Sequence, residues 1–551
     1  MSHVITQACC NDASCVPVCP VGCIHPTPDE PGFATAEMLY IDPASCIDCG
    51  ACVSECPVGA ISRDTRLGEA GQTYLGLATA FYQGNPLPSG LPVADLAARR
   101  SARLSVAVVG SGAAGSYAAT ELLAAEGVSV TVFDQLPTPW GLVRGGVAPD
   151  HQHTKDVTKV FERAADDGRF RFYLNVEVGK HISHDELVRH YDAVIYAYGA
   201  AQDRQLGIAG ADMPHSVSAT EFVNWYNGHP DYADRAFDLS GQRAVIIGNG
   251  NVALDIARML ALGPEQLATT DIADHALDAL ASSAIEEIVV LGRRGPAQAA
   301  YTTPELIGLC DVPGIDIITL PDEVAIDTIS REELDNAPAK RIKTDLAANC
   351  ARGQLTPGNK RIILRYFASP AEITAQGVRV ARTRLERGPD GGIRAVPTGT
   401  EETLETGLII RSVGYRGTPI QGLPFDADRS VVHHEDGRVL DPATGIPIRG
   451  VYVTGWIKRG PTGGIGTNRK CARDTVRHLL DDHADGELQS RSHDHDIFDT
   501  LIRERQPNVV DLAGWRRIHD RETELGRNAG KPRRKLTSRA DLLHAALGRQ
   551  G

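Results

Sequence analysis

Long apolar runs are absent from this sequence, and so is any stretch that marks a protein for export. The longest apolar runs, such as residues 105–109 and 244–247, fall far short of the ~20 residues that a helix needs to cross a bilayer. The first ten residues have neither the cationic nor the apolar part of a secretory signal. We therefore expect no membrane insertion and a cytoplasmic location.

Basic residues are also scarce. The chain has 56 Lys and Arg against 70 Asp and Glu, a net charge of −14, which argues against nucleic acid as a partner because phosphate binding needs a cationic face. The deficit is greatest in residues 1–64, where Arg63 is the one basic residue. The carboxylates of this segment are Asp12, Asp29, Glu30, Glu37, Asp42, Asp48, Glu55 and Asp64. We expect this acidic module to dock on a basic surface of the same chain.

Aromatic residues make up only 5% of the chain, but 42% of all residues are hydrophobic. That apolar share excludes a disordered protein. At about 100 to 200 residues per domain, a length of 551 residues predicts three or four compact units.

Cysteine is rare in most of the chain and crowded at its start. Nine of the 12 cysteines are Cys9, Cys10, Cys15, Cys19, Cys23, Cys46, Cys49, Cys52 and Cys56. Thiols inside a cell are more often metal ligands than disulfides. Residues 46–57 have the pattern C-x2-C-x2-C-x3-C-P, the complete cluster-binding run of bacterial ferredoxins. A zinc knuckle is a weaker alternative, and a disulfide knot is weaker still because nine cysteines cannot all pair.

An upstream cysteine run is incomplete. Residues 15–20 preserve C-x3-C-P, but the middle thiol of a full C-x2-C-x2-C is missing before them. In paired runs of this kind the fourth cysteine ligates the other cluster, which divides the thiols into two groups. The group expected to hold a [4Fe-4S] cluster is Cys19, Cys46, Cys49 and Cys52. The group left for a second cluster is Cys9, Cys15 and Cys56.

The second cluster has two possible forms. Three ligands suit a [3Fe-4S] cluster, and residues 2–63 resemble the seven-iron bacterial ferredoxins, which contain one. The gap between the first two cysteines is shorter here, and Cys10 is an alternative fourth ligand that would make this cluster [4Fe-4S]. Cys23 is expected to be a buried thiol that binds no iron.

A glycine turn typical of dinucleotide binding begins at Gly110. The run Gly110-Ser-Gly112-Ala-Ala-Gly115 follows a predicted apolar strand and opens a predicted helix, so its backbone N–H groups can approach a pyrophosphate. Asp134 ends the next predicted strand, where a carboxylate can bind a ribose. An acidic residue at that position favours FAD or NAD. An unrelated glycine turn is the weaker alternative.

A second glycine-rich loop lies at residues 455–468, between a predicted strand at 451–454 and a predicted helix at 470–480. The start of that helix offers free N–H donors and about half a positive charge. This environment suits the polar edge of a reduced flavin ring. The alternative is an ordinary helix-capping loop.

Residues 248–253 have the pattern G-x-G-x-x-A, again between a predicted strand and a predicted helix. After the strand at 288–291 the chain continues with Arg293 and Arg294, where an NAD-specific site has an acid. Because guanidinium groups bind phosphate in a bidentate way, this pair favours NADP. An apparent insertion at 262–283 lengthens the usual spacing, and a solvated arginine pair is the alternative.

Five stretches carry a resemblance to a known family. They are residues 136–151, 246–255, 292–295, 411–416 and 455–468. With them, residues 103–547 resemble the adrenodoxin-reductase family of ferredoxin–NADP+ reductases. The cysteine-rich start is similar to the form of this family, of mycobacterial type, that has a fused N-terminal ferredoxin.

This resemblance implies an α/β fold with two Rossmann-like domains, one for FAD and one for NADP, preceded by a small α+β ferredoxin-like iron–sulfur domain. The expected parts are an iron–sulfur domain at 1–65, a linker at 66–104 with a short helix at 93–100, a FAD domain at 105–203 and 451–551, and an inserted NADP domain at 204–450.

The resemblance and the glycine turns also nominate binding residues. Those expected against FAD are Gly110, Gly112, Ala114, Gly115, Asp134, Leu142, Val178, Trp456, Gly463, Gly464 and Ile465. Those expected against NADP are Arg204, Asn249, Gly250, Asn251, Val252, Arg293, Arg294, Glu305 and Gly463. His151 and Glu305 are candidate catalytic residues at the junction of the two rings. The alternative for His151 is that it only forms hydrogen bonds within its loop.

The implied activity is that of a ferredoxin–NADP+ reductase. Hydride would pass between NADPH and FAD, and single electrons between FAD and the clusters of the chain's own ferredoxin domain, an external ferredoxin or another one-electron acceptor. One alternative is an electron-input subunit of a larger complex, like the small chain of glutamate synthase. A less favoured alternative is a redox sensor without catalytic turnover.

Overall fold

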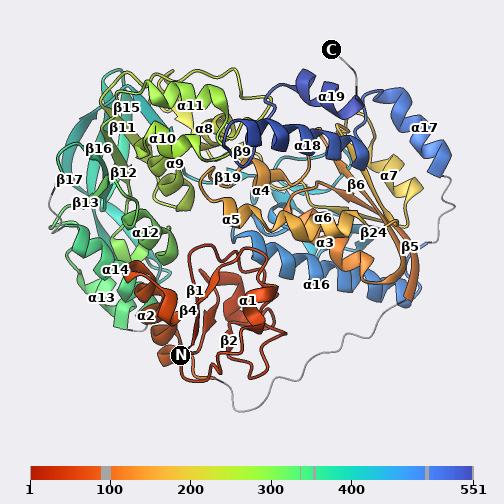
Figure 1. Ribbon diagram of the computed structural model, residues 1–551, viewed down its shortest axis with the longest axis horizontal. Coiled ribbons are helices and arrows are strands. Elements are labelled where there is room, and N and C mark those ends of the chain that lie inside the picture. The colour runs from red at the N-terminus through yellow and green to blue at the C-terminus, as the bar shows by residue number, and fades with distance from the viewer. Residues whose placement is uncertain (1, 88–100, 336, 352–354, 490–494, 549–551) are drawn as a thin grey trace.

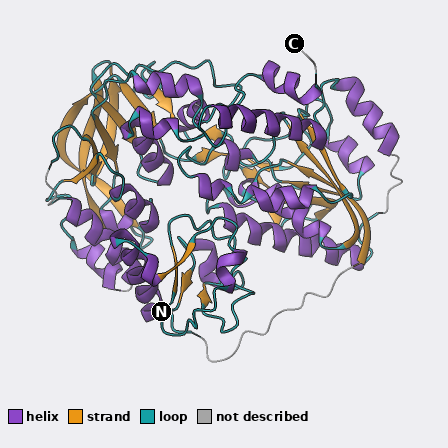
Figure 2. Cartoon of the chain, viewed as in Figure 1, coloured by secondary structure: helices purple, strands orange, loops and turns teal. Residues whose placement is uncertain are grey.

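The computed structural model describes residues 2–87, 101–335, 337–351, 355–489 and 495–548. Three parts stand out in Figure 1: an N-terminal module in red, a domain in green, and a domain of orange and blue segments. Figure 2 shows that both larger domains contain a sheet with helices around it. No helix within the described ranges is long and apolar enough to span a membrane.

The N-terminal module is the small α+β unit that was predicted. Two short antiparallel ribbons form it, with β1 paired to β4 and β2 paired to β3. Its elements are β1 (His3–Ile5), β2 (Ile24–His25), β3 (Tyr40–Ile41), α1 (Ala51–Glu55), β4 (Ile61–Arg63) and 3-10 turns at Pro31–Thr35 and Asp64–Arg66. Its apolar core is centred on buried Phe33, Met38 and Leu39. Such a small core needs additional cohesion, which bound metal can supply.

The region expected to be a linker contains a long helix, α2 (Glu69–Gly84). Tyr82 on α2 donates hydrogen bonds of 2.9 Å to the carbonyls of Cys23 and Tyr40, and Phe81 stacks on Tyr40 at 4.4 Å. Tyr74 donates to the carbonyl of Pro304 in the green domain at 3.4 Å. Residues 69–84 therefore extend the module and attach it to that domain. The short helix expected at 93–100 lies outside the described residues.

The FAD-side domain is built on a sheet with the strand order β22-β23-β24-β8-β5-β6-β7. Its strands are β5 (Ser101–Val109), β6 (Glu126–Asp134), β7 (Phe170–Leu174), β8 (Ala193–Tyr196), β22 (His434–Glu435), β23 (Arg438–Leu440) and β24 (Pro447–Val453). Its helices are α3 (Ala113–Leu123), α4 (Gly141–Gly145), α5 (Gln152–Lys155), α6 (Thr158–Ala165), α7 (His184–His190), α15 (Trp456–Arg459) and α16 (Ile465–Ala484). Val106 and Ala107 of central β5, whose side chains point to opposite faces, are both fully buried, as expected for a parallel strand covered on both faces.

The sheet of this domain extends beyond the boundary expected at residue 451. β24 begins at Pro447, β23 pairs with it in antiparallel fashion, and β22 pairs with β23 at the sheet edge. These edge strands, β22 and β23, are only two and three residues long. Such short segments have no periodicity that a sequence can reveal.

The NADP-side domain has a six-stranded parallel sheet in the order β10-β18-β11-β12-β14-β13. Its strands are β10 (Ser216–Ser218), β11 (Arg243–Ile247), β12 (Glu287–Leu291), β13 (Ile315–Thr319), β14 (Lys360–Arg365) and β18 (Leu408–Arg411). Its helices are α8 (Ala219–Tyr226), α9 (Asn251–Ala261), α10 (Pro264–Ala268), α11 (Asp274–Ala281), α12 (Thr303–Cys310), α13 (Thr328–Asp335), α14 (Pro338–Cys350) and a 3-10 turn at Pro296–Gln298. The expected insertion at 262–283 is the pair α10 and α11.

One face of this sheet is covered by an antiparallel sheet that the sequence did not indicate. Its strands are β15 (Ala368–Thr374), β16 (Gly377–Arg387) and β17 (Ile393–Glu405). Val378 and Val380 of β16 pack against Ile247 of the parallel sheet in one apolar cluster. Shorter ribbons join β9 (Gln202–Asp203) to β19 (Tyr415–Arg416) and β20 (Phe425–Asp426) to β21 (Val431–Val432).

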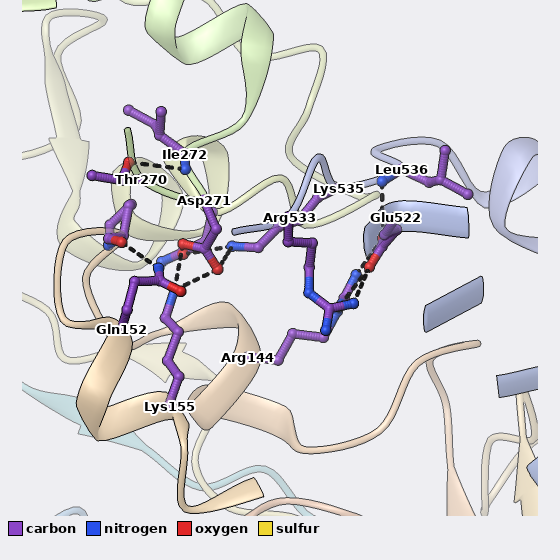
Figure 3. A network of polar contacts seen from close by, with 12 residues as sticks. Arg144, Gln152, Lys155, Thr270, Asp271, Ile272, Glu522, Arg533, Lys535 and Leu536 are labelled. Carbon is purple, nitrogen blue, oxygen red and sulfur yellow. Dashed lines mark hydrogen bonds and ion pairs between the residues drawn. The ribbon is translucent and has the colours of Figure 1, made fainter. Parts of the chain in front are cut away.

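The C-terminal segment closes the molecule on the side opposite the N-terminal module (Figure 1). Its helices are α17 (His495–Arg505), α18 (Leu512–Asn528) and α19 (Arg539–Leu547). Glu522 on α18 is 0% exposed and forms ion pairs with Arg144 at 2.6 Å and Arg533 at 2.8 Å (Figure 3). This pairing satisfies a carboxylate that would otherwise be costly to bury.

A second part of the same network reaches the NADP-side domain. Buried Asp271, between α10 and α11, forms ion pairs with Lys155 of α5 at 2.7 Å and with Lys535 at 3.2 Å (Figure 3). The two lysines hold the pKa of Asp271 below its usual value despite burial. The C-terminal segment therefore ties the two nucleotide domains to each other.

Candidate functional site

The first glycine turn is shaped by close backbone approaches. Gly110 has φ +103°, and a Cβ there would lie 2.6 Å from the carbonyl oxygen of Ala197. A Cβ on Gly115 would lie 1.9 Å from the carbonyl oxygen of Gly110. Only glycine fits at these positions, and α3 begins directly after the turn with its first N–H groups free for a phosphate.

Asp134 closes this turn from the end of β6. One of its oxygens accepts hydrogen bonds from the N–H and hydroxyl of Ser111 at 2.9 and 2.5 Å, and the other accepts from the N–H of Leu136 at 3.0 Å. Burial raises the pKa of Asp134, although these bonds oppose the shift. Asp134, which we expect to bind a ribose, thus also fixes the shape of the glycine turn.

Two further loops pack onto the turn. A Cβ on Gly141 would lie 2.9 Å from Cα of Gly112, and a Cβ on Gly455 would lie 2.5 Å from Cβ of Ala114. Leu142 and Trp456, the residues that follow these two glycines, are therefore brought to the turn as predicted. Val178 is half-buried in a separate apolar cluster behind β6, so its nearness to these residues stays a prediction.

Leu142 and Trp456, the two predicted flavin contacts, each have a group that no described residue covers or pairs with. Leu142 is 44% exposed beside the glycine turn, so its apolar side chain is open to a ligand there. The indole N–H of Trp456 is buried without a hydrogen-bond partner among the described residues, and its ring stacks on Tyr415 at 5.7 Å. Such groups fit a flat ring that offers both an apolar face and polar edge atoms.

The loop before α16 presents a helix N-terminus to the same place. Gly463 has φ +76°, Gly464 caps the helix, and Ile465 is its first residue. α16 packs along α3, so the N-terminal ends of both helices border the first glycine turn. Their dipoles favour negative charge at this point.

The second glycine turn has the same design in the NADP-side domain. Gly248 has φ +113°, and a Cβ there would lie 2.1 Å from the carbonyl oxygen of Ser412. Asn251 begins α9, and its side chain forms hydrogen bonds with Thr302 at 2.8 and 3.3 Å. The side chain of Asn249 lies against Gly292, directly before the arginine pair.

The predicted phosphate-binding arginines are free to bind an anion. Arg293 is exposed and Arg294 is half-buried, and neither forms an ion pair within the described part of the chain. Arg204 lies elsewhere, in a cavity that it lines together with Arg416 and Pro461 of the glycine-rich loop. The cavity thus borders both nucleotide domains.

The two candidate catalytic residues meet around a buried arginine that sequence reasoning missed. Arg258 on α9 donates to Asp150 at 2.6 Å, to Asp255 at 2.7 Å and to Nε2 of His151 at 2.8 Å. Its third nitrogen lies 3.9 Å from Glu305. A charged residue at position 258, three places after Asp255 on the apolar face of a predicted helix, was the available signal.

This cluster has a defined charge and proton arrangement. Because a guanidinium can only donate, Nε2 of His151 is the acceptor in its hydrogen bond with Arg258. Burial opposes ionisation of Asp150, but Arg258 holds its pKa below the usual value. Burial and the charge of Asp255 raise the pKa of Glu305. Although His151, Asp255 and Glu305 could together ligate a metal ion, Arg258 already supplies the positive charge.

Four predicted iron ligands line one pocket of the module. They are Cys19, Cys46, Cys49 and Cys52. Burial, followed by the neighbouring thiols, raises the pKa of Cys52 to about 11, a penalty that a cationic iron centre removes. Cys23 lines the same pocket, with its sulfur 3.5 Å from that of Cys19. Cys23 is buried, as expected.

The other three predicted ligands form a second group. Cys15 interacts electrostatically with Cys9 and Cys56, and burial followed by these neighbours raises its pKa. Burial also raises the pKa of Cys9 to about 11. Cys15 interacts with Cys52 as well, so the two thiol groups adjoin. Cys10 is buried near Cys9 and Cys56 and stays a possible fourth ligand.

The module docks on basic side chains of both larger domains, as its acidity predicted. Asp12 pairs with Arg469 of α16 at 3.0 Å, and exposed Asp29 pairs with Arg473 one helical turn further on at 2.7 Å. The third acidic contact, Glu37, lies 3.6 Å from Lys343 and accepts a bond of 2.7 Å from the N–H of Thr303. Contacts on the FAD side and on the NADP side thus hold one module.

Comparisons with known proteins agree with this geometry. The family described as "Pyridine nucleotide-disulphide oxidoreductase" matches residues 104–289, and the "4Fe-4S binding domain" matches residues 39–62. The "Probable ferredoxin/ferredoxin--NADP reductase" of Mycobacterium tuberculosis is 50% identical over 99% of this chain and 95% of its own length. The chain belongs to the ferredoxin–NADP reductase family.

Two more members of this family define the shared part of the fold. The structure of Mycobacterium tuberculosis FprA in complex with NADPH is 43% identical, with a TM-score of 0.76 over 81% of this reductase and 100% of that chain. The mitochondrial NADPH:adrenodoxin oxidoreductase of Arabidopsis thaliana is 39% identical over 80% of this reductase and 95% of its own length. These matches confirm the predicted fold and the oxidoreductase class, and they favour a reductase over the subunit and sensor alternatives.

Proposed function

We propose that FAD binds between the first glycine turn, the Leu142 helix and the loop from Trp456 to Ile465. The residues that would hold it are Gly110, Gly112, Ala114, Gly115, Asp134, Leu142, Trp456, Gly463, Gly464 and Ile465. The exposed Leu142 side chain and the unpartnered Trp456 indole N–H fit such a ring. Val178 completes the proposed set.

We propose that NADP(H) binds at the second glycine turn, with its 2′-phosphate on the unpaired guanidinium groups. The residues that would hold it are Arg204, Asn249, Gly250, Asn251, Val252, Arg293, Arg294, Glu305 and Gly463. The cavity between Arg204 and Pro461 supports a ligand that reaches from this turn toward the flavin loop.

The chain's own residues set charge and proton positions around these groups. When bound, the two nucleotides supply hydride transfer between each other, and iron–sulfur clusters carry electrons singly. The N-terminus of α16 stabilises negative charge beside Gly464. Arg258 donates to Nε2 of His151 and orients its ring, and Glu305, whose pKa is raised, is the nearby group able to hold a proton.

We propose that Cys19, Cys46, Cys49 and Cys52 ligate the [4Fe-4S] cluster, since their thiols line one pocket. The second group, Cys9, Cys15 and Cys56, has three thiols and suits [3Fe-4S]. Ligation by Cys10 would instead give a second [4Fe-4S] cluster. Electron paramagnetic resonance (EPR) of the anaerobically purified, oxidised protein separates these forms, because an oxidised [3Fe-4S] cluster gives a signal and an oxidised [4Fe-4S] cluster does not.

The observation that carries the proposed function is the placement of the module. It contacts α16 of the FAD side through Asp12 and α12 of the NADP side through Glu37, so the module touches both nucleotide domains. In this position a single chain can oxidise NADPH and pass electrons to its own clusters or to an external acceptor such as a ferredoxin.

Coenzyme preference tests the nucleotide assignment. Replacing Arg293 and Arg294 by alanine should raise KM for NADPH about 10-fold or more, since each charged hydrogen bond contributes about 1.5 to 3 kcal/mol. KM for NADH should not change. Arg384→Ala, which removes an exposed arginine on β16, is the matched control. An equal effect on both coenzymes would contradict the assignment.

A further inference from the structure

The two thiol groups of the module have different surroundings. The segment that follows Cys9 lies on the start of α16, where the N–H of Gly466 donates a hydrogen bond of 2.7 Å to the carbonyl oxygen of Cys10. A Cβ on Gly466 would lie 1.8 Å from the carbonyl oxygen of Asn11. Gly466 directly follows Ile465 of the proposed flavin loop. The residue directly after the proposed flavin loop is therefore in backbone contact with the cysteine segment.

Asp12 anchors this contact from within. One carboxylate oxygen pairs with Arg469 of α16 at 3.0 Å, and the other accepts a bond of 2.7 Å from the hydroxyl of Tyr117 on α3. Its side chain is 3% exposed. α3 and α16 are the two helices that border the proposed flavin site. The Cys9–Asp12 segment is therefore bound to both of these helices.

The pocket of the other thiol group reaches the protein surface. Cys49 is exposed, and two apolar side chains beside it, Ile47 and Val53, are 59% and 40% exposed. Apolar residues exposed next to a redox centre suit transient contact with a partner. Glu55, two residues after Val53 at the end of α1, is exposed as well.

Charge selects the kind of partner that fits this surface. The acidic residues Asp12, Asp29 and Glu37 already pair with basic residues inside the chain. Exposed Glu55 forms no ion pair among the described residues, whereas Asp48, beside Ile47, pairs with Arg63 at 3.2 Å, and Arg66 is the other basic residue of the module. A partner with a basic rim around an apolar centre complements it in the way that α16 and α14 complement the opposite side.

We propose that Cys9, Cys15 and Cys56 are the flavin-facing thiols, which receive electrons first, and that Cys19, Cys46, Cys49 and Cys52 are the outward-facing thiols, which release them to a basic one-electron acceptor protein docked over Ile47 and Val53. The proposal rests on the proposed function. Oxidation of one NADPH to NADP+ and a proton yields two electrons. They pass singly through the flavin-facing and then the outward-facing group, so two acceptor molecules are reduced.

Two double variants of the full chain separate this order from its reverse. In Cys9→Ala/Cys15→Ala, the outward-facing cluster should give its EPR signal with dithionite, which shows that the cluster is assembled, but not with NADPH. In Cys46→Ala/Cys49→Ala, NADPH should still reduce the flavin-facing cluster, while reduction of cytochrome c, a basic one-electron protein, should be lost.

The outcomes distinguish the inference from the function beneath it. Reduction of the outward-facing cluster by NADPH in Cys9→Ala/Cys15→Ala, as fast as in the unmodified chain, would overturn the order. So would an unmodified chain in which NADPH bleaches the flavin but leaves the outward-facing cluster oxidised while dithionite reduces it. If NADPH bleaches no flavin even in the unmodified, fully loaded chain, the proposed function itself fails.

A charge reversal tests the docking surface separately. Glu55→Lys should raise KM for cytochrome c about 10-fold at low ionic strength, and added salt should shrink the difference. Glu504→Lys on α17 reverses an exposed charge far from the module and is the matched control. Ferricyanide, a small anion, should show no such KM increase with Glu55→Lys. Equal cytochrome c kinetics in Glu55→Lys and Glu504→Lys would remove this surface as the docking site.

Discussion

The two ends of the chain hold the nucleotide domains together from opposite sides but by different means. The N-terminal module brings acidic side chains to basic helices, and its pair Asp29–Arg473 is 80% and 41% exposed. The C-terminal segment makes buried pairs, in which its Glu522, at 0% exposure, binds Arg144 and its Lys535 binds Asp271. Exposed pairs are weak and screened by salt, whereas breaking a buried pair is costly. The C-terminal contact should therefore be insensitive to salt, whereas the exposed part of the module contact should weaken when salt is added.

The largest expected change in the free energy of unfolding comes from removing the buried charge of the C-terminal contact. Glu522→Gln leaves Arg144 and Arg533 without their counterion, so the free energy of unfolding should fall by about 3 to 5 kcal/mol. Chemical denaturation of the FAD-loaded protein measures it. Glu524→Gln on the exposed face of α18 is the control and should cost less than about 0.5 kcal/mol. Equal losses of unfolding free energy in Glu522→Gln and Glu524→Gln would contradict the contrast between buried and exposed ion pairs.

The C-terminal contact should also make the free energy of unfolding depend on pH. Burial lowers the pKa of Lys535 from 10.5 to about 7, against the opposing effect of Asp271. Between these two values the unfolded chain binds more protons than the folded one, so stability rises with pH, by up to about 1.4 kcal/mol per unit, and this gain is lost toward pH 7. Thermal unfolding of Lys535→Met from pH 7 to 9 should lack this slope. A slope identical to that of the unmodified chain would contradict the assignment.

A smaller effect is expected at the buried anchor of the module. Asp12→Asn removes the charge that pairs with Arg469, and it should loosen the contact by about 1 to 2 kcal/mol. The loss is smaller than for Glu522 because Arg469 is 35% exposed and water can replace its partner. Faster hydrogen exchange at the N–H of Gly466, with unchanged exchange in α18, would show it. Exchange as slow as in the unmodified chain would mean that Asp12 is no anchor.

The smallest effect is expected at the exposed end of the module contact. Arg473→Gln should change the free energy of unfolding by less than about 0.5 kcal/mol, and 0.5 M salt should abolish the difference. Salt titration of the unmodified chain sharpens the comparison, because exchange at the module interface should speed up while exchange in α18 stays constant. If salt also speeds up hydrogen exchange in α18, the two contacts do not differ in salt dependence and the comparison is wrong.

What the sequence predicted correctly lies in short contiguous runs. The glycine turns at Gly110 and Gly248 and the cysteine run from Cys46 carry their chemistry within a few residues, because backbone geometry there requires glycine or a fixed ligand spacing. Both predicted dinucleotide-binding folds are present. The sequence also predicted an acidic module on a basic surface, since charge composition needs no knowledge of contacts.

What the sequence did not predict depends on pairing across long distances. Asp12 and Arg469 are 457 residues apart, and Arg144 and Glu522 are 378 apart, so no local pattern connects them. Arg258 was missed because it becomes meaningful only when Asp150 of the other domain arrives beside it. The sheet of β15 to β17 was missed because much of β17 faces solvent with charged side chains, which hides the alternation typical of a strand.

One titration tests the central claim most directly, namely that this single chain passes electrons from NADPH to its own iron–sulfur groups. Protein loaded with FAD and iron is titrated anaerobically with NADPH while flavin absorbance and cluster EPR are followed in the same sample. We predict that the flavin bleaches and that the cluster signals change in the first equivalents, with no added ferredoxin. Bleached flavin beside clusters that stay oxidised, although dithionite reduces them, would contradict the account.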